Sequence, residues 1–266
     1  MKVFPEFFNS IRTTLSRYLP PVYIVHEDFN KEGVDGRVIA YIDRLSYVAE
    51  QYKTLRTNLY SLSPENPIKT VVITSSQPWE GKTVTCCNLA ITISYDKEKK
   101  VILIDADMRK PAIHSFFGLP NEPGFSDLLS GKVSLEKFTT KPAIGDLFII
   151  PAGSPIDDPA EILSSTNVDP LIKKIKSAFD YAIFDSPPVL EFTDASILGS
   201  LCDAVILVVK AASTQEQAIQ EALNLLSEAQ ATPKACVLTN VVHLLDSRYH
   251  FYKYKQKIRS TAEKEP

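Results

Sequence analysis

The chain has 266 residues, of which 44% are hydrophobic and 23% are charged, and its formal net charge at pH 7 is -3. These values are ordinary for a globular protein large enough for one α/β domain with extensions. The small net charge gives no overall attraction to nucleic acid, so we expect no nucleic-acid partner. No apolar run approaches the ~20 residues of a membrane span. The four cysteines lack metal-binding spacing and are expected to be reduced.

Residues 1–20 form the first predicted element. Apolar residues from Phe4 to Leu19 recur at helical spacing, polar residues take the other face, and Pro20 ends the pattern. Three interpretations are open: a helix packed on its own domain, a helix on a membrane surface, or a docking helix for a partner. Residues 21–38 have no periodicity and are predicted to be a linker.

A second helical pattern runs from about Val38 to Leu62. Within it, Glu50, Lys53 and Arg56 are spaced by three, which sets them at neighbouring positions on one helix face. On spacing alone, this is most often a solvated charged face.

The stretch Val71–Leu89 is predicted to be a buried strand, a tight loop and a helix over about 82–95. Such a junction directs backbone N–H groups and a helix N-terminus at a phosphate. Lys82 can reach β- and γ-phosphates, and the Thr83 hydroxyl can bind Mg²⁺. Ser76 stands where the Walker A pattern has its first Gly, so a chance Gly-Lys-Thr is the alternative. The predicted nucleotide-binding residues are Ser76, Gln77, Pro78, Trp79, Glu80, Gly81, Lys82, Thr83 and Val84.

Two further apolar strands end in carboxylates. Asp105 and Asp107 close the strand within 99–111, and Asp185 closes the strand within 181–189. Open α/β sheets bind ligands at the C-terminal ends of their strands. These acids are therefore predicted to face Mg²⁺ and a hydroxyl to be deprotonated; the alternative for the first pair is a helix cap plus a surface acid.

The remaining pattern completes the fold class. Asp158, Pro159 and Glu161 are typical of a helix start with a capping box. Strands are predicted at 203–210 and 234–242, with a helix at about 214–228 between them. This alternation predicts an α/β protein with a doubly wound, mostly parallel sheet and helices on both faces, the P-loop NTPase fold.

The tail from Asp246 carries Tyr249, Tyr252 and Tyr254 among basic residues. It is either a disordered basic end, an anchor for an anionic membrane surface, a stacking surface for nucleic acid, or a set of tyrosines that are themselves substrates. Composition leaves these alternatives open.

Eight segments together resemble one protein family. They are SYVAEQYKTLRTN, TSSQPWEGKT, VILIDADMRKP, GFSDLLSG, PAGSPIDDPAEIL, FDYAIFDSPPVLEFTDA, DAVILVVKAAST and VLTNVV. In this order, over roughly residues 46–255, the chain resembles the bacterial tyrosine kinases of capsular and exopolysaccharide synthesis. The resemblance implies an ATP-dependent protein-tyrosine autokinase that regulates polysaccharide synthesis and export.

The resemblance also implies roles for the site residues, with ATP and Mg²⁺ as cofactors. Lys82 and Thr83 would be the Walker A residues for phosphate and Mg²⁺. Asp105 and Asp107 would form a second acidic motif, with Asp105 as the base toward tyrosine. Asp185 would hold the metal or its water, and Asn240 would contact adenine. The implied catalytic set is Lys82, Asp105 and Asp107, and the implied metal set is Thr83, Asp105, Asp107 and Asp185.

For assembly, the resemblance implies that the helix over 39–62 joins subunits into a ring through Glu50, Lys53 and Arg56, with Lys53 replacing an arginine. The tail of each subunit would enter the neighbour's active site, with Tyr249, Tyr252 and Tyr254 as phosphoacceptors. Family members of this length work with a separate membrane adaptor of the polysaccharide co-polymerase type. The expected location is cytoplasmic, at the inner face of the membrane. The expected divisions are 1–38, a kinase domain over 39–242 and a tail over 243–266.

Two positions bear on alternative functions. Trp79 stands where many family members have Gly, so it either shields the phosphates from water or packs on the loop. Partition and division-site ATPases carry a signature Lys at the position of Gln77, which disfavours an ATPase switch. A nucleotide-binding scaffold without catalysis is the third alternative.

Overall fold

The computed structural model describes residues 33–63, 65–96, 99–137, 144 and 146–241. Its first helices are α2 (Ile39–Ile42) and α3 (Tyr47–Ser61), where the sequence predicted one helical stretch. The Asp43 carboxylate accepts the Leu45 N–H, and the Ser46 hydroxyl accepts the Ala49 N–H at 3.1 Å. These local bonds compete with helix continuation and cap a new helix, so α2 ends and α3 begins here.

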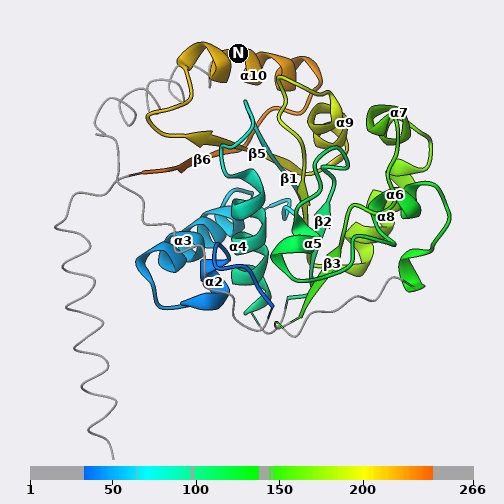
Figure 1. Ribbon diagram of the computed structural model, residues 1–266. Helices are drawn as coiled ribbons and strands as arrows, with labels where there is room; N and C mark the ends of the chain where they lie inside the picture. Colours follow the sequence, from blue (N-terminus) through cyan, green and yellow to red (C-terminus); the bar gives the residue numbers. More distant parts are fainter. Residues whose placement is uncertain (1–32, 64, 97–98, 138–143, 145, 242–266) are drawn as a thin grey trace, which may run out of the picture.

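A six-stranded parallel sheet forms the centre of the domain (Figure 1). The strand order is β3-β2-β4-β1-β5-β6, so β4 lies between β2 and β1. The strands are β1 (Thr70–Ser75), β2 (Val101–Asp105), β3 (Leu147–Ile150), β4 (Tyr181–Asp185), β5 (Ala204–Lys210) and β6 (Ala235–Thr239). Five of them lie where the sequence predicts strands; β3 was not predicted.

Helices connect the strands, as parallel pairing requires. They are α4 (Lys82–Ser94), α5 (Ile113–Phe116), α6 (Phe125–Leu129), the short η1 (Leu135–Lys137), α7 (Pro159–Leu163), α8 (Val168–Ala178), α9 (Asp194–Leu201) and α10 (Glu216–Glu228). The predicted helix start at Asp158 is confirmed, because its carboxylate accepts the N–H groups of Ala160 and Glu161.

Side chains from successive strand residues enter two separate cores. In β1, Val71 and Ile73 pack with α2, α3, α4 and α5, whereas Val72 packs with α6 to α10. The other strands alternate in the same way, so both faces of the sheet are buried (Figure 1). The predicted doubly wound fold with helices on both faces is confirmed.

The start of the domain lies earlier than predicted. Val34 and Val38 are buried, and the Asp35 N–H donates to the Phe116 carbonyl. The Arg37 guanidinium lies over the Phe116 ring at 4.2 Å and pairs with Asp35. Residues 33–38 therefore pack on the domain rather than forming a linker, since these apolar side chains have a surface to bury against. The rest of the predicted N-terminal segment, including residues 1–20, and the tail over 243–266 lie outside the described residues.

Helix α4 anchors the elements before the sheet. The Asn88 amide accepts the Ala40 N–H at 2.8 Å and donates to the Arg37 carbonyl at 3.0 Å. Arg56 Nη1 on α3 donates to the Thr92 carbonyl on α4 at 2.9 Å. These bonds tie α2 and α3 to the helix that begins at the phosphate loop. In the described part of the chain, no helix has the length and apolar character needed to span a membrane.

Candidate active site

The loop after β1 turns sharply before α4 begins. Trp79 has φ of 65° and Gly81 has φ of 92°. Glycine adopts this left-handed region freely, whereas another residue there costs about 1–2 kcal/mol. A Cβ at Gly81 would also lie 3.2 Å from Thr239 Cγ2. The Thr85 N–H donates to the Gly81 carbonyl, so the N–H groups of the preceding first turn of α4 stay available to a phosphate.

The carboxylate of Glu80 holds this loop from the inside. Glu80 is buried, and its Oε2 accepts the Gln77 N–H at 2.9 Å. The Thr214 hydroxyl, from the loop after β5, donates to Oε1. The Thr239 hydroxyl, at the end of β6, donates to the Glu80 carbonyl at 2.6 Å. The loop is thus fixed to the C-terminal ends of two strands before any nucleotide arrives.

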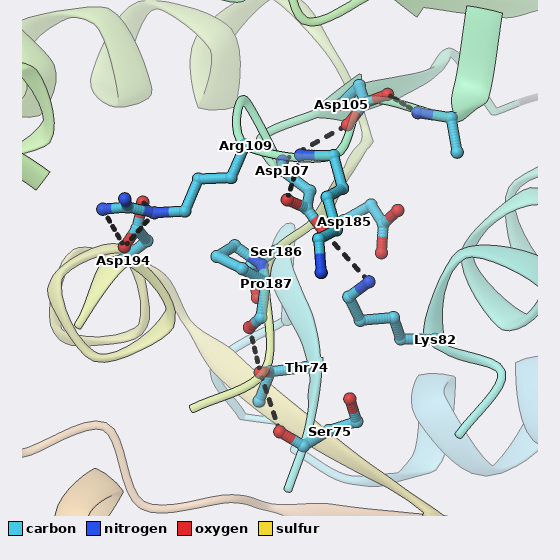
Figure 2. Close-up of polar contacts among 12 residues, drawn as sticks. Thr74, Ser75, Lys82, Asp105, Asp107, Arg109, Asp185, Ser186, Pro187 and Asp194 are labelled. Carbon is cyan, nitrogen blue, oxygen red and sulfur yellow. Dashed lines mark hydrogen bonds and ion pairs between the residues drawn. The ribbon is translucent and has the colours of Figure 1, made fainter. Parts of the chain in front are cut away.

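Lys82 forms an ion pair across the site. Its Nζ lies 3.0 Å from Asp107 Oδ2, in the loop after β2, and both side chains are largely buried. Burial disfavours the ammonium, but the Asp185 and Asp107 carboxylates outweigh this and raise the pKa of Lys82 above its usual value. Lys82 is therefore a fixed positive charge at the head of α4 (Figure 2).

Asp185 ends β4 beside Lys82 (Figure 2). It is 1% exposed, its Oδ1 accepts the Cys86 thiol at 3.4 Å, and its Oδ2 has no hydrogen-bond partner among the described residues. Burial raises the pKa of Asp185 to about 6, although Lys82 and a hydrogen bond from the Thr83 hydroxyl lower it. A buried carboxylate oxygen without a partner is uncommon, and such an oxygen is suited to bind a ligand.

Asp105 lies beneath the site and is 0% exposed. Its Oδ2 accepts the N–H groups of Ala112 and Ile113, each at 2.9 Å, and its Oδ1 accepts the Asp107 N–H at 3.2 Å. Burial and the neighbouring Asp185, its partner in the β2–β4 register, raise the pKa of Asp105 well above its usual range. In this geometry Asp105 holds the loop that carries Asp107.

The arrangement fits magnesium that arrives with a nucleotide. Within the described chain, no group of three or more His, Cys, Asp or Glu side chains could hold a metal ion. Mg²⁺ does not need such a cage, because it typically takes one or two carboxylates, phosphate oxygens and waters. The buried Oδ2 of Asp185, which has no hydrogen-bond partner among the described residues, and the Thr83 hydroxyl beside that carboxylate are oxygens of this kind.

A cavity of about 350 Å³ opens above Lys82. Its walls come from the phosphate loop, the loop after β2 and the loop after β4, with Arg37 contributing from the start of the domain. The predicted site residues that line it are Pro78, Trp79, Gly81, Lys82, Thr83, Val84 and Asp107. The predicted residues Ser76, Gln77, Glu80, Asp105, Asp185 and Asn240 are not in its lining.

One wall of the cavity is held by a buried ion pair. Arg109 Nη2 lies 3.1 Å from Asp194 Oδ2, and Asp194 is fully buried at the start of α9. The Arg109 guanidinium also lies 4.2 Å from the centre of the Phe192 ring. In Figure 2, Arg109 and Asp194 extend away from Lys82, so they support the wall rather than the floor.

Asn240 follows β6 and is not in the cavity lining. Its φ is 60°, and its Nδ2 donates to the Ala211 carbonyl at 3.2 Å. The Ser76 hydroxyl, in the phosphate loop, is buried without a hydrogen-bond partner among the described residues. The predicted contact of Asn240 with adenine stays a prediction.

The three predicted oligomerisation residues lie on α3. Lys53 Nζ pairs with Glu50 Oε1 at 2.5 Å, one turn apart and partly exposed. Arg56 is bound to the Thr92 carbonyl of its own chain. Tyr249, Tyr252 and Tyr254 lie outside the described residues.

Comparisons with known proteins show which family the chain resembles over most of its length. A family model described as an AAA domain matches residues 68–239. The tyrosine-protein kinase YwqD of Bacillus subtilis (strain 168) is 35% identical over 215 residues, which cover 81% of this chain and 90% of that protein. The chain belongs to the bacterial tyrosine kinase family.

Two further members show the extent of the likeness. The tyrosine-protein kinase Wzc of Salmonella typhimurium is 31% identical over 229 residues, but the chain spans only 32% of its length. The kinase domain of the Escherichia coli tyrosine kinase ETK superposes with a TM-score of 0.76 at 25% identity, covering 86% of this chain and 90% of that domain. Since these relatives are named tyrosine kinases, the ATPase switch is not favoured.

Sequence reasoning missed several residues of this site. Arg37 lines the cavity but lies in a stretch without periodicity, so no pattern indicated it. Thr214 lies between two other polar residues in a loop, so nothing in the sequence singled it out. Arg109 follows the acidic pair by two residues, and that proximity was the one available signal.

Proposed function

We propose that the chain is an ATP-dependent protein-tyrosine kinase that phosphorylates its own C-terminal tail in trans and regulates capsule or exopolysaccharide synthesis. The observation that carries the proposal is the Lys82–Asp107 ion pair at the head of α4. It lies beside the buried Oδ2 of Asp185, which has no hydrogen-bond partner among the described residues. Phosphoryl transfer needs positioning and charge neutralisation more than covalent chemistry. A fixed cation and an acid in the cavity, with a buried carboxylate oxygen beside them for the metal, supply both.

The roles follow from charge and position. The first-turn N–H groups of α4 and Lys82 would bind the β- and γ-phosphates, with Thr83 and Asp185 as the protein oxygens toward Mg²⁺. Mg²⁺, when bound with ATP, would neutralise the phosphate oxygens. Asp194 and Arg109 would keep the opposite wall in place.

We propose Asp107, rather than Asp105, as the base for the acceptor hydroxyl. A tyrosine hydroxyl has a pKa of about 10 in free form and needs a carboxylate within hydrogen-bond reach. Asp107 lines the cavity, and its partner Lys82 would turn to the phosphates once ATP binds. The oxygens of Asp105, which our sequence prediction made the base, accept backbone N–H groups. Its proposed role is to position the loop.

The acceptors are proposed to be Tyr249, Tyr252 and Tyr254. The test is purified protein with ATP and Mg²⁺, followed by mass spectrometry of residues 246–260. Phosphate on any of the three tyrosines, absent in Lys82→Met, supports the kinase. ATP hydrolysis without phosphotyrosine would contradict it and select the ATPase switch instead.

Assembly and partners are part of the same proposal. We expect a ring of subunits joined through α3, because Glu50 and Lys53 are partly exposed there. We also expect a membrane adaptor of the polysaccharide co-polymerase type, and hence a cytoplasmic location at the inner membrane. Residues 1–20 are a candidate for direct membrane contact; liposome flotation with and without them tests this, and identical partitioning would remove the idea.

A further inference from the structure

Trp79 combines three unusual features. It is the single tryptophan of the chain, it is 90% exposed, and it takes a left-handed φ of 65°. An exposed indole gains nothing from burial, and the backbone conformation disfavours any side chain. Folding alone therefore gives no reason for a tryptophan here.

The position of Trp79 indicates a binding role. The cavity lining includes the apolar side chains of Trp79, Pro188 and Phe192, which we call the mouth, and the charged pair of Lys82 and Asp107, which we call the floor. Arg109, Lys110 and Glu191 also line the cavity. Phosphates need only the floor. An apolar mouth suits a ring with a polar tip, which is the chemistry of a tyrosine side chain.

We propose that Trp79 is an acceptor-binding residue, whose indole contacts the ring of the tyrosine to be phosphorylated. This rests on the proposed kinase function. An in-line transfer brings the acceptor oxygen to the side of the γ-phosphate opposite the leaving group. The phenol would enter between Trp79 and Phe192, with its hydroxyl at Asp107. Serine or threonine lacks a ring to contact the indole, so Trp79 adds affinity for tyrosine.

The two sides of the mouth differ in rigidity. Phe192 is covered by Arg109, which the buried Asp194 holds in place. Among the described residues, no aromatic or cation–π partner is found for Trp79. One side is therefore preformed, and the other is free to take up an incoming ring.

The test uses the full chain and a peptide copying residues 246–260. Trp79→Gly removes the ring and relieves the backbone, Trp79→Ala removes the ring alone, and Trp79→Phe keeps an aromatic. We expect both small residues to raise KM for the peptide about tenfold, the size of one lost aromatic contact. KM for ATP should change less than threefold, and Phe should restore peptide binding. If Trp79→Gly raised KM for the peptide and Trp79→Ala did not, the cause would be a looser loop, and the proposal would be overturned. An equal rise in KM for ATP would also overturn it.

A second readout does not need catalysis. Because Trp79 is the only tryptophan, fluorescence in the presence of Mg²⁺ and ADP reports this position alone. The peptide should change the emission saturably, and the same peptide with its tyrosines replaced by alanine should not. Equal responses to the two peptides, or none, would overturn the proposal. Saturable binding without phosphotransfer by the wild type would support Trp79 while contradicting the kinase function.

Discussion

Lys82 and Asp107 face each other at the floor of the cavity, with 3.0 Å between Nζ and Oδ2. One residue begins α4, and the other follows β2, so the sheet brings them together. Without nucleotide, the cation that should hold phosphate is neutralised by the acid that should take the acceptor proton. ATP must replace Asp107 as the partner of Lys82, and this exchange would release the base only when phosphate is present.

This exchange predicts opposite effects on binding and transfer. Asp107→Asn removes the competitor for Lys82, so ATP affinity should stay the same or increase by a few fold. Transfer to tyrosine should fall about 10²–10⁴-fold, the usual contribution of a positioned base. Calorimetry and single-turnover phosphorylation measure the two quantities separately. Unchanged transfer by Asp107→Asn would refute this assignment; Asp105→Asn is the comparison, with thermal stability measured alongside.

Asp185 predicts a pH-dependent difference in stability. Its folded pKa is about 6 against a usual value of 3.8, so the folded state binds the proton more tightly. The loss of folding stability caused by ionising Asp185 is absent below pH 3.8. It grows as the pH rises toward 6 and is fully present above pH 6. Without nucleotide at pH 7.5, Asp185→Asn should therefore have a higher melting temperature than wild type. Its free energy of unfolding should be larger by up to about 3 kcal/mol. The gap should close near pH 4.

Magnesium supplies the control for that variant. Mg²⁺ with ATP should raise the melting temperature of the wild type, since a ligand that binds only the folded state stabilises it. Asp185→Asn should lose most of this increase. Two results would contradict this role of Asp185. One is a melting temperature of Asp185→Asn below that of wild type without nucleotide at pH 7.5, and the other is a full Mg²⁺–ATP-dependent increase in the variant.

We expect substitution of Glu80 to weaken nucleotide binding, although Glu80 is not in the cavity lining. Glu80→Ala leaves the Gln77 N–H and the Thr214 hydroxyl without their acceptor. Because both hydrogen bonds are only partly buried, the cost for each donor should be at the lower end of about 1–3 kcal/mol. The loop should loosen and ATP should bind about tenfold more weakly, as measured by nucleotide fluorescence. Glu216→Ala, an exposed acid on α10, is the matched control. Equal ATP affinity in both variants would show that the loop needs no internal support.

We expect substitution of Glu50 to change the assembly of subunits without changing the fold of each subunit. Its pair with Lys53 is partly exposed and contributes only about 0.2–0.5 kcal/mol to the monomer. Glu50→Ala should therefore lower the sedimentation coefficient of the assembled protein and leave its denaturant midpoint almost unchanged. Glu221→Ala, exposed on α10, controls for the lost charge. If both variants sediment like the wild type, α3 does not join subunits through Glu50.

Much of the fold could be predicted because buried parallel strands leave apolar runs in the sequence, and Asp105 and Asp185 mark where two of them end. β3 was missed because its four residues, Leu147–Ile150, are too few to show a period. The break between α2 and α3 was missed because Asp43 and Ser46 act through local side-chain bonds, which do not disturb the apolar spacing.

The site shows the same limit. The sequence motifs predicted that Lys82, Asp107 and Asp185 lie at one edge of the sheet. They could not predict which carboxylate oxygens accept hydrogen bonds from the protein itself. That depends on the path of the loop after β2, where the N–H groups of Ala112 and Ile113 bind Asp105. Arg37 depends on the packing of residues far from the motifs, so no local pattern could reveal it.

The bond from Arg56 to the Thr92 carbonyl has a thermodynamic consequence. Helix α4 carries Lys82 at its first turn and Thr92 near its last, about 15 Å away at 1.5 Å per residue. A second copy that binds α3 would therefore affect the position of α4, whose first turn is proposed to bind the phosphates. Linkage is reciprocal: by whatever factor ATP changes the affinity between copies, association must change the affinity for ATP. Local concentration of the protein would then set how much nucleotide it needs.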